Sequence, residues 1–287
     1  MNPPVHRLGL VLKREDPSVP RIVSGIIPWL QERGVEIFID QDSVGEPVHV
    51  SATVVPPEEL PGLVDAVSVF GGDGTFLYAA RMVAARGVPI LGINLGSLGF
   101  LTEVKLERMR EAFKSLLAGD YQFEDRMLLD VEVIKNGSPF ARYSALNDAV
   151  INKGALARII ELEVSVDSQL VTMTRADGII ISTPTGSTGY SLSAGGPILH
   201  PTLEALIITP ICPHTLTNRP VVVPDSAVVG VCLRHGHDVM LTVDGQVGMP
   251  LEQGDSLRIG KADHSMRLIQ MEASPFFKLL REKLKWG

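Results

Sequence analysis

A glycine-rich turn, Gly71-Gly72-Asp73-Gly74-Thr75, constrains this chain more than any other segment. The apolar, β-branched residues 64–70 precede it, and the helix-compatible residues 76–83 follow it. In this order the N–H groups of the turn and the N-terminus of the helix lie at the carboxyl end of a strand, where they bind phosphate. The turn is neither a Walker A loop nor a G-x-G-x-x-G fingerprint. We therefore expect another kind of phosphate site, formed by Gly71, Gly72, Gly74 and Thr75.

Asp73 places a carboxylate inside this turn. A carboxylate among phosphate-facing amides repels phosphate, so it needs a task such as accepting a proton from an attacking hydroxyl or holding Mg²⁺. The alternative is a tight turn in which the carboxylate of Asp73 caps the following helix. The residues of the turn alone leave both interpretations open.

Length and composition exclude several classes of protein. The 287 residues suffice for two domains, and 45% hydrophobic with 21% charged residues is ordinary for a globular protein. A net charge of −7 disfavours a general nucleic-acid or membrane binder. No Cys/His cluster suggests a metal site, and no G-x-S-x-G motif suggests a serine hydrolase.

The apolar runs and the cysteines favour a cytoplasmic protein. Residues 8–12 are too short for a signal peptide, and no run approaches the ~20 apolar residues of a membrane span. Cys212 and Cys232 form no C-x-x-C pair, so we expect free thiols in a reducing compartment.

Strand and helix patterns alternate in the first part of the chain. The predicted strands cover residues 8–12, 35–39, 64–70 and 89–93. The predicted helices cover residues 19–33, the residues after Asp73, and 103–118, with Gly34 and Gly119 just past the first and the last. This alternation predicts βαβ units and a parallel, Rossmann-like sheet with ligands at the carboxyl ends of its strands. A second glycine-rich turn, residues 94–100, lies at one of those ends.

After about residue 122, short β-rich runs follow one another with little helix. The predicted strands cover residues 128–134, 145–151, 158–166, 178–182, 221–223, 228–233, 239–243, 256–259 and 266–271. Many short strands separated by turn signals predict an all-β, sandwich-like second domain. We therefore assign residues 1–122 to an α/β domain and residues 123–270 to a β-sandwich domain.

The last segment, residues 271–287, predicts an amphipathic helix that begins at Ser274-Pro275. Its predicted apolar face consists of Phe276, Phe277, Leu280 and Leu284. We expect this helix to pack back on the first domain, and a helix on a membrane surface is the alternative.

Three polar segments interrupt the β-rich half. Asn147-Asp148 lies within the apolar residues 145–151, where polar groups need either ligand hydroxyls or a structural hydrogen bond as partners. Residues 182–193 carry eight hydroxyl side chains, which suits a ligand site or a flexible linker. The segment 242–246 contains Asp244-Gly245 and by itself predicts only a hairpin turn.

Together these segments resemble NAD kinases in order and spacing. The resemblance rests on the first glycine-rich turn, residues 94–100, Asn147-Asp148, and Asp177-Gly178 leading into residues 185–197, and it covers almost the whole chain. Diacylglycerol, sphingosine and phosphofructokinase-type kinases share the first turn, whereas Gly-Ser-Thr-Gly-Tyr-Ser and the Asn-Asp pair are more specific. Two departures are mild, because the family often has Asn-Glu for the pair and Ala at position 189.

The resemblance implies transfer of the γ-phosphoryl group of ATP to the adenosine-ribose 2′-hydroxyl of NAD⁺. It implies that Asp73 accepts the proton of that hydroxyl, and that Mg²⁺ arrives with the nucleotide rather than in a protein cage, with no bound organic cofactor. It implies a homotetramer or homodimer with the NAD site between the domains and bordered by a neighbouring subunit. The NAD-binding residues that it implies are Gly74, Phe100, Asn147, Asp148, Arg158, Arg175, Asp177, Thr188, Gly189, Tyr190, Ser191, Leu192, Ser193 and Gln246.

Arg175 bears on which redox form is phosphorylated. A basic residue here resembles NAD⁺-selective, ATP-using kinases, so we expect NAD⁺ to be preferred over NADH, and an exposed arginine beside a turn is the alternative. Two other functions stay under consideration: a lipid kinase, which would need a surface for acyl chains, and a catalytically silent NAD(P)-binding regulator, which the presence of Asp73 and its glycines disfavours.

Overall fold

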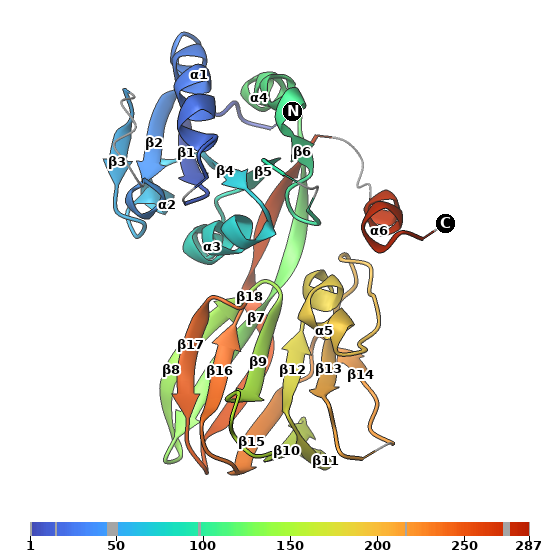
Figure 1. The fold of residues 1–287 in the computed structure, drawn as a ribbon. Coiled ribbons are helices and arrows are strands. Elements are labelled where there is room, and N and C mark those ends of the chain that lie inside the picture. The colour runs from blue at the N-terminus through green and yellow to red at the C-terminus, as the bar shows by residue number, and fades with distance from the viewer. Residues whose placement is uncertain are drawn as a thin grey trace. The chain divides into compact units, whose positions relative to one another are not determined.

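The computed structural model describes residues 2–14, 16–44, 51–96, 99–215, 217–271 and 276–286. The chain forms two compact units, which are described separately (Figure 1). The α/β unit comprises Met1–Asp125 and Met266–Gly287, and the β unit comprises Arg126–Ser265. Two long strands, β7 (Gln122–Lys135) and β18 (Ser256–Gln270), contribute residues to both units.

A parallel sheet forms the centre of the α/β unit. Its strands are β1 (Arg7–Leu12), β2 (Glu36–Asp40), β3 (Thr53–Val55), β4 (Ala66–Gly71), β5 (Ile90–Asn94) and β6 (Val104–Lys105). The order β5-β4-β1-β2-β3 makes β1 and β4 neighbours, and Leu8 is aligned with Ala66. The last residues of β18 extend this sheet next to β5, where Leu268 is aligned with Ile90.

Helices cover both faces of this sheet (Figure 1). The helices of this unit are α1 (Val19–Gln31), α2 (Leu60–Leu63), α3 (Asp73–Val83), α4 (Met109–Ala118) and α6 (Phe276–Leu284), the last of which stands apart from the sheet in Figure 1. The helices α1 and α4 cover one face, and α2 and α3 cover the other (Figure 1). β4 is buried along its whole length. Strands that are covered on both faces have nearly continuous apolar sequences, as the sequence of β4 does.

The predicted α/β architecture is confirmed, with one boundary corrected. The helix expected over residues 103–118 begins at Met109, because Val104–Lys105 pairs with β5 and Leu106–Arg108 forms a 3-10 turn. Gly34 (φ +78°) and Gly119 (φ +70°) follow α1 and α4 in the left-handed conformation that favours glycine. The short elements β3 and α2 were not predicted.

The β unit is an antiparallel sandwich, as predicted. One sheet has the order β14-β13-β12-β9-β16-β17, and the other contains β8, β7, β18, β15, β10 and β11. Besides β7 and β18, the strands of this unit are β8 (Ser138–Ala145), β9 (Asp148–Lys153), β10 (Ile160–Val166), β11 (Gln169–Ala176), β12 (Gly178–Ser182), β13 (Ala205–Ile211), β14 (Val221–Pro224), β15 (Val229–His235), β16 (Val239–Val243) and β17 (Val247–Leu251). Inward side chains of both sheets, among them Leu162, Ile181 and Leu241, form one core.

Two expectations about the end of the chain are wrong. The runs 256–259 and 266–271 belong to one continuous strand, β18, rather than to two. On α6 the buried face consists of Phe276, Leu279 and Leu280, whereas the side chain of Phe277 is 65% exposed. This helix packs within the α/β unit, and its predicted cap, Ser274-Pro275, lies outside the described residues. None of the helices in the described ranges has the length and apolar character needed to cross a bilayer.

Candidate functional site

Asp73 lies where the strand order of the α/β sheet reverses. β1 and β4 are neighbours, while the chain continues from β1 toward β2 and from β4 toward β5. The crevice outside the carboxyl ends of two such strands is the usual ligand site of an open α/β sheet. β4 ends at Gly71, Gly72 is the N-cap of α3, and Asp73 is the first residue of that helix. The structure therefore puts the glycine-rich turn and Asp73 at the carboxyl end of β4, next to the point where the strand order reverses.

The first glycine of the turn is required by close packing. A Cβ at position 71 would lie 2.4 Å from Oγ1 of Thr75, so only glycine lets the helix follow the strand this tightly. At Gly72 and Gly74 a Cβ would meet nothing within 4 Å. An added Cβ would thus be tolerated at these two glycines, and the N-terminus of the helix carries the partial positive charge that attracts anions.

The carboxylate of Asp73 does not cap its own helix. No side chain caps α3 at Gly72. Instead, Oδ2 of Asp73 accepts a hydrogen bond from the N–H of Phe100 and Oδ1 accepts one from the N–H of Leu101, both at 3.0 Å. The hydroxyl of Thr102 lies 3.4 Å from Oδ1. The helix-cap interpretation of Asp73 is therefore wrong, because the carboxylate is fixed by the second glycine-rich turn.

The second turn is shaped to receive this carboxylate. A Cβ at Gly99 would lie 2.0 Å from Oδ1 of Asp73, so a glycine is needed at this approach. Asn94 supports the turn, because its amide donates to the hydroxyl of Thr102 at 2.7 Å and its carbonyl oxygen accepts the N–H of Gly96 at 2.7 Å. Asp73 is thus oriented by backbone groups that are themselves braced by a buried asparagine.

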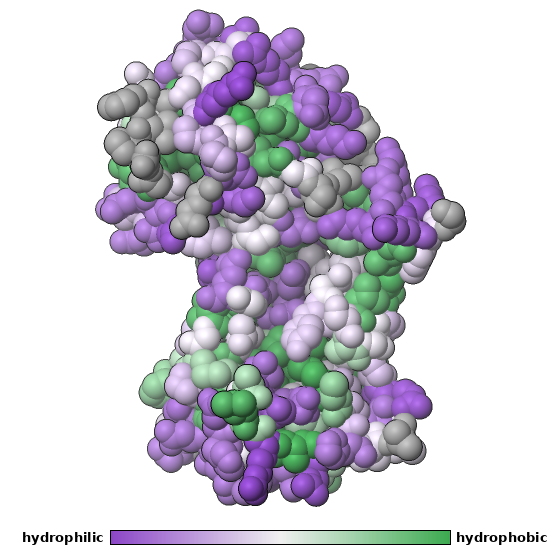
Figure 2. All heavy atoms as spheres, in the orientation of Figure 1, coloured by the Kyte–Doolittle hydropathy of each residue, from purple (hydrophilic) through white to green (hydrophobic). Residues whose placement is uncertain are grey.

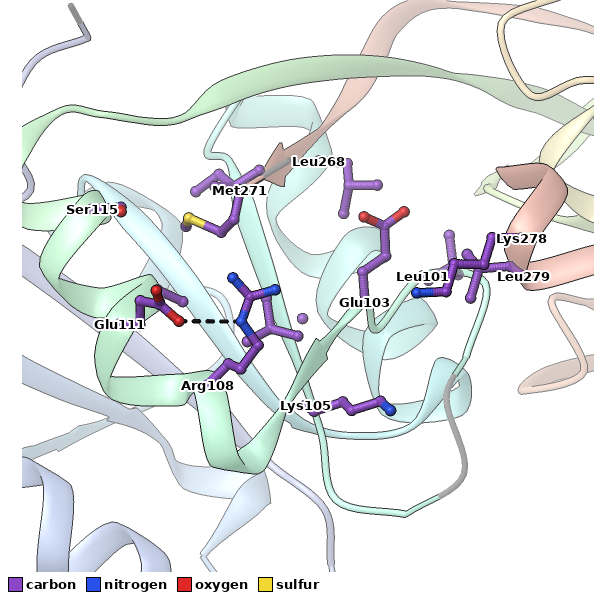
Figure 3. A pocket seen from close by; sticks show the side chains of 14 residues that line it. Leu101, Glu103, Lys105, Arg108, Glu111, Ser115, Leu268, Met271, Lys278 and Leu279 are labelled. Carbon is purple, nitrogen blue, oxygen red and sulfur yellow. Dashed lines mark hydrogen bonds and ion pairs between the residues drawn. The ribbon is translucent and has the colours of Figure 1, made fainter. Parts of the chain in front are cut away.

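A cavity of about 460 Å³ lies on another side of this turn (Figure 3). Its lining includes Leu101, whose N–H holds Asp73, and Leu279 of α6. The guanidinium of Arg108 extends into it and pairs with Glu111 at 3.1 Å (Figure 3). The described lining contains none of the residues predicted for catalysis or NAD binding, so the predicted chemistry is not located in this cavity.

In the β unit, the Asn147-Asp148 pair is held by Asp244. The carboxylate of Asp244 accepts the N–H groups of Leu146, Asn147 and Asp148 at 3.0, 2.7 and 3.2 Å. Asp244 and Gly245 have positive φ values of 50° and 66°, as the predicted Asp-Gly hairpin turn between β16 and β17 requires. The residue that forms the hairpin therefore also fixes the loop that presents Asn147 and Asp148.

Asp148 is a buried carboxyl group beside a second carboxylate. It is 5% exposed, and its side chain receives no hydrogen bond from the other described residues. Burial, followed by the charge of Asp244, raises the pKa of Asp148 from its ordinary value to about 7. A buried carboxyl group without a protein donor can accept a hydrogen bond from a ligand hydroxyl.

The hydroxyl-rich segment packs directly against this loop. The hydroxyl of Thr183 donates to the carbonyl of Leu146 at 2.6 Å, and a Cβ at Gly186 would lie 2.1 Å from the carbonyl oxygen of Asn147. The segment forms a 3-10 turn (Thr185–Thr188) and the short helix α5 (Tyr190–Ser193). The linker interpretation is therefore wrong, because these residues are ordered and their turn is buried.

The remaining predicted residues differ in their placement. Thr188, Gly189, Tyr190, Ser191, Leu192 and Ser193 follow the Gly186 contact in one continuous segment. Tyr190 is 44% exposed, whereas Ser191 is buried and pairs with the hydroxyl of Thr209 at 2.9 Å.

Asp177 lies at the other end of β12 from the Asn147-Asp148 pair. Ser182 is aligned with Asp148 and Gly178 with Asn152, so Asp177 is roughly 16 Å along the strand from Ser182 at about 3.3 Å per residue. There it forms an ion pair with Lys153 at 3.7 Å. Arg175 is exposed on β11, and Arg158 and Gln246 are exposed outside strands. Among the described residues, the hydrogen bonds of Asn147 are made with Asp244 and Thr183.

Three contacts of the site were missed by the sequence analysis. The N–H groups that hold Asp73 belong to residues 27 and 28 positions away, and no local pattern signals such a contact. The role of Asp244 was hidden because Asp-Gly is common in hairpins. The sequence analysis assigned no role to Lys283 of α6, whose ammonium lies 3.9 Å from Oδ2 of Asp73. Within the described ranges, no three His, Cys, Asp or Glu side chains gather as metal ligands.

Comparisons with known proteins match both halves of the chain. Residues 8–121 match the ATP-NAD kinase N-terminal domain, and residues 146–271 match the ATP-NAD kinase C-terminal domain. NAD kinases of Geobacter sulfurreducens and Koribacter versatilis are 49% and 45% identical to the chain, each over at least 98% of both sequences.

Solved structures agree with these matches. Yeast NADH kinase complexed with NADH has a TM-score of 0.91 and 26% identity, covering 99% of this chain and 89% of that one. An NAD kinase from Archaeoglobus fulgidus in complex with ATP has a TM-score of 0.76 and 28% identity, covering 98% of this chain and 100% of that one.

Proposed function

The chain belongs to the NAD kinase family and phosphorylates NAD to NADP with ATP, and we propose that Asp73 is the carboxylate that accepts the proton of the attacking 2′-hydroxyl. The single observation that supports this role most directly is the position of Asp73 at the reversal of strand order, with its carboxylate fixed by two backbone N–H groups. An aspartate is a weak base. Phosphoryl transfer tolerates this, because positioning and charge neutralisation dominate its rate.

The phosphates of ATP are proposed to bind at Gly71, Gly72, Gly74 and Thr75, at the N-terminus of α3, whose partial positive charge attracts anions. The divalent cation is proposed to be Mg²⁺ that arrives on the nucleotide. Asp73 suits this arrangement better than direct coordination, because its carboxylate already accepts two N–H groups and faces the ammonium of Lys283. When bound, the cation would neutralise phosphate charge.

NAD is proposed to be bound by the β unit through Asn147 and Asp148, with Thr188–Ser193 alongside them. Support comes from the buried carboxyl group of Asp148, which receives no hydrogen bond from the described residues, and from the tight packing of Gly186 on Asn147. Asp177 is proposed to contact a more distant part of the extended dinucleotide. Arg158 and Gln246 of the β unit, and Gly74 and Phe100 of the α/β unit, are proposed as further NAD-binding residues. Arg175 is proposed to favour NAD⁺ over NADH.

The protein is further proposed to be a cytoplasmic homodimer or homotetramer. Its two cysteines, Cys212 and Cys232, are free thiols, which fits a reducing compartment. Figure 2 shows hydrophobic side chains at the surface of the β unit among polar ones. The exposed apolar residues of the β unit include Leu170, Val171 and Met173 on β11, an edge strand of its sheet.

One assay tests the reaction and its selectivity. The purified protein is incubated with ATP, Mg²⁺ and, in separate reactions, NAD⁺, NADH or a dispersed diacylglycerol, and each phosphorylated product is quantified. We expect NADP⁺ as the main product, little NADPH and no phosphatidic acid. Phosphatidic acid without NADP⁺ would indicate a lipid kinase, and no product from any acceptor would indicate a silent binding protein.

A further inference from the structure

The C-terminal helix α6 brings a cation to the carboxylate of Asp73. Nζ of Lys283 lies 3.9 Å from Oδ2 of Asp73, and the side chain of each residue is 31% exposed. The same ammonium lies 4.9 Å from the ring centroid of Phe100, within the range of a cation–π contact. Phe276, at the start of α6, lies 6.5 Å from Phe100 between ring centroids. Lys283 thus approaches Asp73 over an aromatic surface.

This placement follows from the way α6 is anchored. Phe276, Leu279 and Leu280 are at most 7% exposed, so they fix the helix on the α/β unit. Lys283 is four residues after Leu279, and residues at this spacing lie on neighbouring parts of one helix face. The lysine is therefore presented by a packed helix rather than by a loose terminus.

The hydrogen bonds of Asp73 indicate which oxygen faces the reaction. Oδ1 accepts the N–H of Leu101 and has the hydroxyl of Thr102 at 3.4 Å, whereas Oδ2 accepts the N–H of Phe100. A carboxylate oxygen has two acceptor positions, so within the described part of the chain Oδ2 keeps one. The 3.9 Å separation from Lys283 is too long for a hydrogen bond and leaves that position open. An incoming hydroxyl that donates to Oδ2 would lie beside the ammonium of Lys283.

We propose that Lys283 is a catalytic residue whose ammonium contacts the phosphoryl group during transfer. The transferred group carries negative charge on its equatorial oxygens, and a fixed cation beside it stabilises the transition state. The ring of Phe100 lies 4.9 Å from the ammonium and replaces solvent on that side, which strengthens this attraction. The inference rests on the proposed role of Asp73 and adds a second residue, from the end of the chain, to the same centre.

The test compares two methionine variants on one helix. Lys283→Met keeps an unbranched apolar side chain but removes the charge. Arg281→Met removes a charge from an exposed position of the same helix and serves as the matched control. We expect Lys283→Met to lower kcat by about 10²-fold with a much smaller change in the KM for NAD⁺, and Arg281→Met to stay near the unmodified enzyme. Lys283→Arg should recover part of kcat, because it restores the charge with a longer side chain.

Asp73→Asn, measured in parallel, separates this inference from the proposed function. If Asp73→Asn loses turnover while Lys283→Met equals Arg281→Met, the role of Lys283 is refuted and that of Asp73 stands. If Asp73→Asn turns over normally, the role of Asp73 is refuted whatever the lysine variants do. Thermal unfolding of each variant shows whether α6 is still packed. A kcat loss in Lys283→Met that Lys283→Arg does not recover at all, together with a lowered Tm, would identify a structural role and overturn the proposal.

Discussion

Asp73 is held by main-chain N–H groups, so its position depends on backbone geometry more than on neighbouring side chains. We expect Asp73→Asn to lower kcat by about 10²-fold or more, because the amide keeps the size of the side chain but loses the proton acceptor. The fold should persist, since the amide oxygen can still accept an N–H group from the second turn. Steady-state kinetics and circular dichroism measure the two effects, and unchanged turnover would refute the assignment.

For Asp148 we predict an effect on how the free energy of unfolding depends on pH. Burial and the charge of Asp244 raise its pKa to about 7 in the folded protein, above the ordinary value of 3.8. Between these values the folded state binds a proton that the unfolded state has released, so this group lowers the free energy of unfolding as the pH rises from about 4 to about 7. The contribution is constant above that range.

Asp148→Asn removes this titration. The variant should gain stability relative to the unmodified protein, by more than about 1 kcal/mol, when the pH is raised from 5 to 8. Urea unfolding at both pH values measures the difference. A stability difference that is the same at both pH values would show that Asp148 does not titrate in this way.

At the scale of elements, the loop that contains Asn147 packs directly against the turn at Gly186. A Cβ at position 186 would lie 2.1 Å from a backbone oxygen of Asn147, a contact that no side-chain rotation relieves. Gly186→Ala should therefore lower stability by about 1–3 kcal/mol and raise the KM for NAD⁺ more than that for ATP.

Gly25→Ala is the matched control for this substitution. Gly25 is exposed on α1, and a Cβ there would meet nothing within 4 Å, so alanine should leave activity unchanged and stability equal or higher. Native stability and native KM in Gly186→Ala would show that the two segments are not packed as described.

Individual strands differ in how well the sequence predicts them. β12 and β16 were predicted to the residue, because apolar β-branched runs there end at clear turn residues. β18 was divided in two because Gly260 and the polar residues after it imitate a turn, whereas the strand continues from one unit into the other. β17 was missed because Pro250 interrupts its pattern, which an edge strand tolerates.

The candidate site was predictable where its chemistry is local. The glycines and Asp73 stand together in the sequence, and so do Asn147 and Asp148. The partners that orient them do not: Asp244 is 97 positions from Asn147, and Lys283 is 210 positions from Asp73 (283 − 73). Such contacts depend on the register of the strands and on where the last helix packs, and single-sequence patterns do not carry that information.

At the scale of the whole molecule, each unit has its own core, and the exposed apolar residues of the β unit suggest a surface for self-association. β11 is at the edge of its sheet, where unpaired backbone groups invite another chain. Val171 and Met173 on this strand are 46% and 47% exposed, and residues two apart lie on one face of a strand.

Replacing both Val171 and Met173 by lysine should lower the molar mass measured by light scattering after size-exclusion chromatography, because two charges per chain oppose burial of this face. The control is Phe140→Lys, on β8, where the side chain is 63% exposed and outside β11. This variant should keep the molar mass of the unmodified protein. A double variant with unchanged molar mass would exclude β11 from the interface, and a monomeric unmodified protein would refute the proposed oligomer itself.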